Sequence, residues 1–243
     1  MQRALKPLLI LILTVVILGL LEAQFHILPG SQVLNQRELA TRILGQYLAE
    51  KYSGKKAIVF SNPFSQKPGQ SREVYQFEKA GLRGLRRGLE PAVSIEAVVF
   101  PEIRPEFLSN PSAVYIDPAT TTPLSYVTTE TAWDALIQQH PGADLIVSLI
   151  GLPVNLRRTE TWRRESGKKF ALLLPDLRLV GDSAAIRQAI ETGKIAALVL
   201  NKPGAPPEDQ PLGRDLKMEF DQRFLLVTAE TVGRQLKLFP KLF

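Results

Sequence analysis

Short polar side chains and one aromatic ring come directly after several strongly apolar segments of the 243-residue chain. If those segments are neighbouring parallel strands, the residues that follow them meet at one edge of the sheet, where such sheets bind ligands. Amides, hydroxyls and carboxylates suit hydrogen bonding to a polar ligand, and an aromatic ring suits stacking on a flat apolar face. The candidate ligand-binding residues are Asn62, Phe64, Ser65, Gly151, Asn155, Asp176 and Asn201.

The same residue types also end strands for a purely local reason. Asn, Asp, Ser, Gly and Pro form turns, because their side chains or backbones satisfy turn geometry. From the residues alone, a ligand site and a set of ordinary turns both remain open.

Groups suited to catalysis are scarce. The histidines are His26 and His140, and His140 precedes Pro141 and Gly142 at a predicted helix end, where a cation can interact with the last carbonyls. No Ser/His/Asp triad, HExxH motif, carboxylate-rich metal pattern or glycine-rich phosphate loop is present. The absence of cysteine excludes disulfides, thiol nucleophiles, thiolate metal sites and a lipoprotein-type anchor. We therefore expect no enzyme, no catalytic residue, no metal and no cofactor; a hydrolase using Asp176 is an alternative that needs a second ionisable group within its reach.

Five continuous apolar runs alternate with amphipathic segments. Runs of this kind are typical of strands buried on both faces of a parallel sheet covered by helices. The predicted fold is α/β, a three-layer, doubly wound, mostly parallel sheet of the flavodoxin-like kind, with strand order 2-1-3-4-5 and a crevice between the first and third strands. We expect strands at 57–60, 95–100, 145–150, 170–174 and 195–200, helices at 72–89, 130–140 and 182–192, and an edge strand at 224–227.

Two further features concern packing and connections. Gly81, Gly84 and Gly88 recur within the helix predicted at 72–89 and indicate that it packs closely on a neighbour. The proline-rich region 101–129 is long for a connection inside a compact domain, which indicates either a functional segment or a surface decoration.

The N-terminus has the order of an export signal. Arg3 and Lys6 precede an apolar run from Leu8 to Leu21, and Glu22 closes it. We expect a signal-anchor over 1–23 that holds the chain in the membrane through residues 4–23, with removal after Ala23 as the alternative. The positive residues place the N-terminus in the cytoplasm and the domain outside the inner or plasma membrane, in the periplasm or extracellular space. A linker at 24–34 then leads to a single α/β domain at 35–243, whose first helix is predicted to start at Asn35.

The net charge of +6 and the isoelectric point near 9.6 favour acidic surfaces as partners. The positive residues are scattered and carry no nucleic-acid-binding motif, so we expect no nucleic acid. One basic cluster contains Trp162 and indicates either contact with anionic lipid or polymer or a merely solvated loop. Its members are Arg157, Arg158, Arg163, Arg164, Lys168 and Lys169.

Four stretches resemble the second lobe of type I periplasmic binding proteins, in the right order along the chain. They are LATRILGQYLAEKYSGKKAIVFSN at 39–62, GADLIVSLIGLP at 142–153, AAIRQAIETGKIAALVLNKPG at 184–204 and FLLVTAETV at 224–232. The resemblance implies a fold that binds sugars or other small solutes, with Asn62, Gly151 and Asn201 facing the cleft. Members of that family close two lobes on the ligand, whereas this chain has room for one.

These observations predict a membrane-anchored extracytoplasmic domain that binds or senses a small solute. Because a single lobe buries a ligand poorly, we expect a second copy or another protein to close the site. The alternative is a structural or assembly component of the cell envelope, which binds other proteins through the 101–129 region or the basic cluster.

Overall fold

The computed structural model describes residues 29–69, 71–164 and 167–243. The predicted signal-anchor at 1–23 lies outside the described residues. Within the described part of the chain, no helix is both long and apolar enough to cross a membrane.

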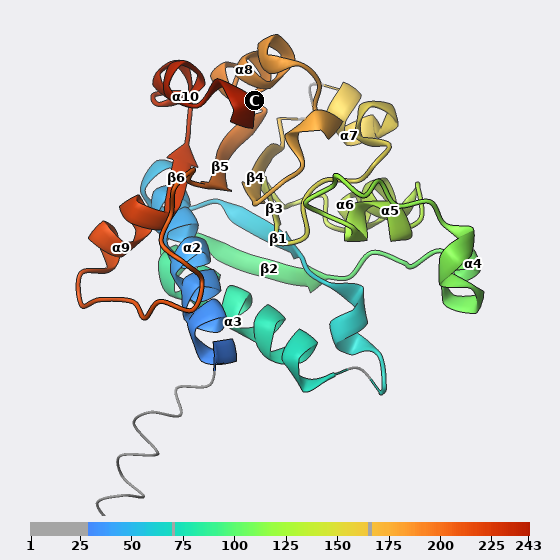
Figure 1. Ribbon diagram of the computed structural model, residues 1–243. Coiled ribbons are helices and arrows are strands. Elements are labelled where there is room, and N and C mark those ends of the chain that lie inside the picture. Colours follow the sequence, from blue (N-terminus) through green and yellow to red (C-terminus); the bar gives the residue numbers. More distant parts are fainter. Residues whose placement is uncertain (1–28, 70, 165–166) are drawn as a thin grey trace, which may run out of the picture.

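A six-stranded sheet forms the centre of the domain, with the order β2-β1-β3-β4-β5-β6 (Figure 1). The first five strands are parallel, and β6 runs antiparallel to β5 at the edge. This arrangement confirms the predicted mostly parallel sheet and its strand order. The strands are β1 Lys56–Phe60, β2 Ser94–Val99, β3 Leu145–Ser148, β4 Lys169–Leu173, β5 Ile195–Asn201 and β6 Phe224–Val227.

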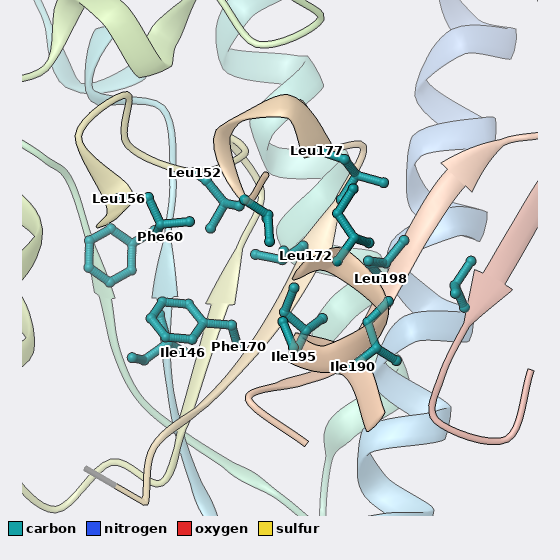
Figure 2. Close-up of a cluster of buried hydrophobic side chains, with 14 of the residues drawn as sticks. Phe60, Ile146, Leu152, Leu156, Phe170, Leu172, Leu177, Ile190, Ile195 and Leu198 are labelled. Carbon is teal, nitrogen blue, oxygen red and sulfur yellow. The ribbon is translucent and has the colours of Figure 1, made fainter. Parts of the chain in front are cut away.

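Alternate residues of each strand point to opposite faces of the sheet, so the buried strands present apolar side chains on both faces. Helices cover both faces. Ala57 and Val59 belong to one buried apolar cluster with residues of α2 Pro29–Lys51, α3 Arg72–Leu89 and α9 Leu216–Arg223. Ile58 and Phe60 belong to a second cluster, part of which Figure 2 shows, and Phe60 stacks on Trp133 with ring centroids 4.0 Å apart. The helices on that face are α6 Ala132–Gln139, α7 Glu160–Arg163, α8 Ser183–Glu191 and α10 Val232–Leu238.

Helix α2 begins six residues earlier than predicted. It starts at Pro29 rather than Asn35, so residues 29–34 of the expected linker are helical, and Asn35 lies inside the helix. Proline is well tolerated in the first turn of a helix, because its missing N–H has no partner there. Packing extends the helix at this end: Gln32 and Gln36 are buried, and Gln36 Nε2 donates a hydrogen bond to the Glu208 carbonyl at 2.9 Å.

The predicted close packing of the glycine-rich helix is confirmed by its contact with α2. A Cβ atom at Gly84 would lie 2.1 Å from the Glu38 carbonyl oxygen, and one at Gly88 would lie 2.3 Å from the Arg42 carbonyl oxygen. The two backbones therefore touch at glycines, with no room for any side chain between them.

We expect Gly84→Ala to destabilise the protein by about 1–3 kcal/mol or more, since the added methyl group must push two backbones apart. Urea denaturation measures the effect. Gly233→Ala on α10 is the matched control, because a Cβ atom there meets nothing within 4 Å. Equal stability of the two variants would contradict the close contact.

The 101–129 segment is a folded connection whose ends are paired. Arg104 N donates to the Val127 carbonyl at 2.8 Å, Thr129 N donates to the Glu102 carbonyl at 2.9 Å, and Ile103 forms an isolated bridge with Thr128. Two short helices lie within it, α4 Pro105–Ser109 and α5 Leu124–Val127. The second half of the segment, from Thr120 onward, packs against the carboxyl edge of the sheet, so this region bears directly on the candidate site.

The described residues also form five short 3₁₀ helices. Two of them follow strands at the carboxyl edge: η1 after β1 and η4 after β4. They are η1 Pro63–Gln66, η2 Pro111–Ala113, η3 Leu156–Arg158, η4 Leu177–Leu179 and η5 Pro240–Leu242.

Candidate functional site

The predicted crevice between β1 and β3 is filled by a buried ion pair. Arg37 Nη2, from α2, donates to Glu78 Oε1 at 2.9 Å and to the Leu149 carbonyl at 3.0 Å. Ser61 Oγ, directly after β1, donates to Glu78 Oε2 at 2.7 Å. The Arg37 guanidinium also lies 4.0 Å from the Phe77 ring centroid. Burial lowers the pKa of Arg37, and Glu78 partly offsets that effect.

The candidates after β1 are engaged with one another in a local turn. Asn62 Oδ1 accepts a hydrogen bond from Phe64 N at 2.9 Å and caps η1, and Ser65 Oγ donates to the Asn62 carbonyl at 2.7 Å. The Phe64 ring meets Phe107 edge-on at 6.0 Å. These contacts match the turn-forming alternative, and the ligand-binding role of the three residues stays a prediction.

The candidates after β3 support the 101–129 segment. Gly151 has a φ of +81°, and a Cβ atom there would lie 2.5 Å from Thr122 Cγ2. Asn155 Nδ2 donates to the Glu130 carbonyl at 2.9 Å, just beyond the segment. Glycine at 151 therefore allows Thr122 to pack directly onto the sheet edge.

The last two candidates, Asp176 and Asn201, line one pocket of about 360 Å³ at the carboxyl ends of β4 and β5. We call it the β4–β5 pocket. The 101–129 segment, η4, the start of α8 and η5 surround it. Its other lining residues are Ala119, Thr121, Leu174, Pro175, Leu177, Arg178, Gly181, Ile186, Leu200, Lys241, Leu242 and Phe243.

Asp176 is held by charge-assisted hydrogen bonds. Its Oδ1 accepts from Arg178 Nε at 2.9 Å, and its Oδ2 accepts from Arg178 Nη2 at 2.6 Å and from Thr120 Oγ1 at 2.9 Å. Burial alone would raise the pKa of Asp176, but the hydrogen bonds from Arg178 and Thr120 outweigh it and hold the pKa below its usual value. Arg178 Nη1 also donates to Asp117 Oδ2 at 2.9 Å, which ties the 101–129 segment to η4.

Asp176 and Arg178 form a charge-assisted pair at the wall of the pocket. Arg178 is the group hydrogen-bonded to the Asp176 carboxylate, and these hydrogen bonds raise the pKa of Arg178. A guanidinium does not exchange protons near neutral pH, so Arg178 itself is no general acid or base.

Asn201 and Leu174 have the features expected of a binding wall. The exposed Asn201 side-chain amide has no hydrogen-bond partner among the described residues, and Asn201 lines both the β4–β5 pocket and a smaller pocket beside Val33 and Phe77. Leu174 has a φ of +47°, which is unusual for a bulky residue, and such strain concentrates at functional sites. Both residues lie at the ends of strands, which hold them rigidly.

The structure divides the basic cluster predicted around Trp162: Arg164, Lys168 and Lys169 line one pocket with Trp162, whereas Arg157 lies apart from them. Lys168 Nζ donates to the Ala143 carbonyl at 2.5 Å, and Lys169 Nζ donates to the Gly193 carbonyl at 3.2 Å. Arg157 Nε instead donates to the Val180 carbonyl at 3.1 Å, toward the opposite edge of the sheet. The two lysines thus donate hydrogen bonds to backbone carbonyls in the turns that follow helices α6 and α8. These contacts favour a role in stabilising the turns.

His140 does end α6 as predicted, but its ring has a different role. Its Nδ1 lies 3.1 Å from Glu96 Oε1, and Lys168 rather than the imidazole reaches the carbonyls beyond the helix. Among the described residues, no group of three His, Asp or Glu side chains could hold a metal ion.

Several important residues were missed at the sequence level. Arg37 and Glu78 fill the β1–β3 crevice, and Arg178 orders one wall of the β4–β5 pocket. The spacing of Asp176 and Arg178 is the one available signal, since residues two apart in a turn can pair. Arg37 and Glu78 lie 41 residues apart and give none.

The sequence matches no protein-family model and no curated protein. Comparison with solved structures finds periplasmic sugar-binding proteins. One is the substrate-binding protein of a sugar ABC transport system from Bordetella parapertussis 12822, with 14% identity, a TM-score of 0.40, and coverage of 68% of this chain and 41% of that protein. A carbohydrate transporter from Acidothermus cellulolyticus 11B, in complex with myo-inositol, has 11% identity, a TM-score of 0.43 and coverage of 85% and 62%. The XylFII–LytSN complex has 9% identity, a TM-score of 0.46 and coverage of 80% and 60%.

The chain weakly resembles this family. That is the resemblance expected from its sequence motifs. It spans between 41% and 62% of the length of these three proteins.

We expect Asp176→Asn to lower the free energy of unfolding by about 1–3 kcal/mol at neutral pH, because charge-assisted hydrogen bonds in a buried position are lost. The pKa of Asp176 in the folded protein lies below the value of about 3.9 for an aspartate in an unfolded chain. The stabilisation by the charged carboxylate is therefore complete above that value and is lost as pH falls through the folded pKa. Urea denaturation at a series of pH values should show that the difference in unfolding free energy between the wild-type protein and Asp176→Asn becomes smaller in acid. The exposed Asp209→Asn is the control; a difference from the wild-type protein that is independent of pH would contradict this assignment.

The positive φ of Leu174 predicts that substitution by glycine and by alanine will have the reverse of their usual order of stability. Leu174→Gly should be as stable as Leu174→Ala or more stable by up to about 1 kcal/mol, because only glycine adopts a positive φ freely. At Leu173, inside β4, glycine should be less stable than alanine. Urea denaturation of the four variants tests this, and the same order at both positions would refute the strain.

Proposed function

We propose that this protein is a membrane-anchored extracytoplasmic domain that binds or senses a small polar solute in the β4–β5 pocket. The observation that carries the proposal is that Asp176 and Asn201, two residues selected from their positions after strands, line one pocket at the carboxyl edge of a parallel sheet. Ligands of such sheets bind at that edge.

The chemistry of the pocket favours a compact ligand with hydroxyl or amide groups. Its volume of about 360 Å³ lies near the lower end of the range for small-molecule sites. The amide of Asn201 can both donate and accept hydrogen bonds, and Thr121 adds a hydroxyl. Leu174, Leu177 and Ile186 supply apolar surface for the less polar side of the ligand.

The ligand we infer is a monosaccharide or a polyol of similar size. This inference agrees with the resemblance of the sequence to solute-binding lobes. We infer binding rather than catalysis, because the carboxylate beside the pocket is fixed by Arg178 and Thr120.

The anchoring part of the proposal rests on the sequence. The positive residues before the apolar run, and the polar residue after it, favour an uncleaved signal-anchor with the domain outside the membrane. The pocket is open at the surface of the domain, so we infer that a second copy or another protein covers it when affinity is high.

We expect the full chain, purified gently in detergent, to retain a small molecule at a stoichiometric mass increment in native mass spectrometry. Asn201→Ala should weaken binding of the identified ligand roughly 10-fold or more, since a polar group of the ligand is then left unpaired. Asn35→Ala, on the exposed side of α2, is the matched control and should bind normally.

A different outcome would favour the alternative function. Retention of a defined protein partner with no small molecule would indicate an envelope assembly component. Tyr115 and Leu108 on the 101–129 segment would then be the first contacts to test, because they are 76% and 50% exposed. Equal ligand binding by Asn201→Ala and the control would refute the β4–β5 pocket as the site.

A further inference from the structure

The outward side of α3 is a basic stripe. Its members recur at spacings of three, four and seven residues, which places them on one face of the helix. Tyr75 lies in the same stripe, is 51% exposed, and has the Lys79 ammonium 5.7 Å from its ring centroid. A shallow pocket of about 430 Å³ runs along this side. We call the stripe the outer face of α3; its exposed cations are Arg72, Lys79, Arg83, Arg86 and Arg87.

Carboxylates balance only part of this charge. Glu38 pairs with Arg83 and Arg87, and Glu90 pairs with Arg86. Glu73 lies beside Arg72 in the first turn. The five cations therefore face three carboxylates, and neither Arg72 nor Lys79 has an ion-pair partner within the described ranges.

The start of α2 lies beside the first half of α3. The contacts of Arg37 with Gly81, Glu38 with Gly84 and Arg42 with Gly88 advance together along both helices, so the two run in the same direction. Val33 and Phe77 accordingly line the same small pocket. Figure 1 shows both helices on this side of the sheet.

This arrangement places α3 near the membrane if the predicted anchor is inserted. Six residues separate Glu22, which closes the apolar run, from Pro29, the first residue of α2. Fully extended, the chain from Glu22 to Pro29 has seven Cα–Cα steps of about 3.5 Å and spans at most about 25 Å. Helix α3 with its 18 residues is about 27 Å long, so its first half lies within reach of the bilayer surface.

We propose that the outer face of α3 docks on the anionic headgroups of the membrane that holds the anchor. The inference rests on the anchoring in the proposed function. Cations near an anionic leaflet are attracted to it, and tyrosine is favoured at the headgroup level. Because the anchor supplies a high local concentration, a weak attraction suffices to orient the domain.

Docking by this face leaves the solute pocket accessible. Leu177 and Ile186, which line the β4–β5 pocket, belong to the apolar cluster on the opposite face of the sheet from α3. The domain would thus rest on the bilayer through one helical layer and turn the Leu177 and Ile186 side of the solute pocket away from it, with Leu174 and Asn201 at the strand ends between the two layers.

The test uses the full chain reconstituted in vesicles, and the absence of cysteine allows single labels. An environment-sensitive fluorophore is attached at Gln66→Cys, beside the outer face of α3, or at Gln188→Cys on α8 as the matched control. The vesicles contain phosphatidylcholine alone or with phosphatidylglycerol. We expect iodide quenching of the label at position 66 to fall several-fold in the anionic vesicles and to recover in high salt, and no change at position 188.

A charge reversal tests the residues directly. Arg72→Glu combined with Lys79→Glu should abolish the protection at position 66, because these cations have no ion-pair partner whose loss would disturb the fold. Arg234→Glu combined with Lys237→Glu on α10 makes the same change of charge elsewhere and should retain the protection. Equal quenching in both kinds of vesicle, or equal loss in both double variants, would overturn the docking surface.

Vesicle flotation separates failure of the anchor from failure of the docking. A chain that floats with neutral vesicles is anchored, and an unprotected label at position 66 in anionic vesicles then refutes docking alone. A chain that floats only with anionic vesicles lacks the anchor, and loss of flotation in the α3 double variant still supports docking. Protection by polyglutamate but not by phosphatidylglycerol would overturn the proposal in favour of an acidic protein partner.

Discussion

The close contact of α2 and α3 determines much of the rest of the structure. Glycines at 45, 84 and 88 let the two backbones touch, and this approach places Arg37 opposite Glu78 at the carboxyl edge of the sheet. Both side chains are buried, with exposed fractions of 7% and 5%. A buried pair of this kind adds little net stability, but the loss of one partner costs about 3–5 kcal/mol because a charge is left uncompensated. The pair therefore fixes the register between the helices and the sheet.

The same ion pair explains where the pocket lies. In a doubly wound sheet, the crevice where the strand order reverses is the usual ligand site, and here that position is between β1 and β3. Arg37 and Glu78 fill it from one face of the sheet, and Thr122 packs onto Gly151 beside it. At the carboxyl ends of β4 and β5 the edge is open, and the pocket with Asp176 and Asn201 is found there. The open site therefore lies two strand positions along the edge from the β1–β3 crevice.

The sheet could be predicted from the sequence because its strands are buried on both faces and appear as continuous apolar runs. The bounds of α3 also match the prediction, since Ser71 caps its first turn and the amphipathic pattern is strong. The start of α2 could not be predicted, because Pro29, Gly30 and Ser31 have the composition of a turn and only packing reveals the helix. The roles of Asn62 and Ser65 were ambiguous for a related reason: side chains that bind ligands also cap turns. The Arg37–Glu78 pair lies on two helices 41 residues apart, and no local pattern joins them.

The wall of the β4–β5 pocket is held by contacts of unequal strength. Asp176 is 4% exposed and accepts hydrogen bonds from Thr120 and Arg178, whereas Arg178 is 53% exposed where it meets Asp117. An exposed ion pair contributes at most about 1 kcal/mol, and hydrogen bonds to a buried carboxylate contribute more. The outer contact at Asp117 should therefore open before the inner one at Thr120. A ligand that engages Arg178 would therefore compete first with Asp117, and the 101–129 segment would respond to occupancy at Asp117 while Thr120 stays bonded to Asp176.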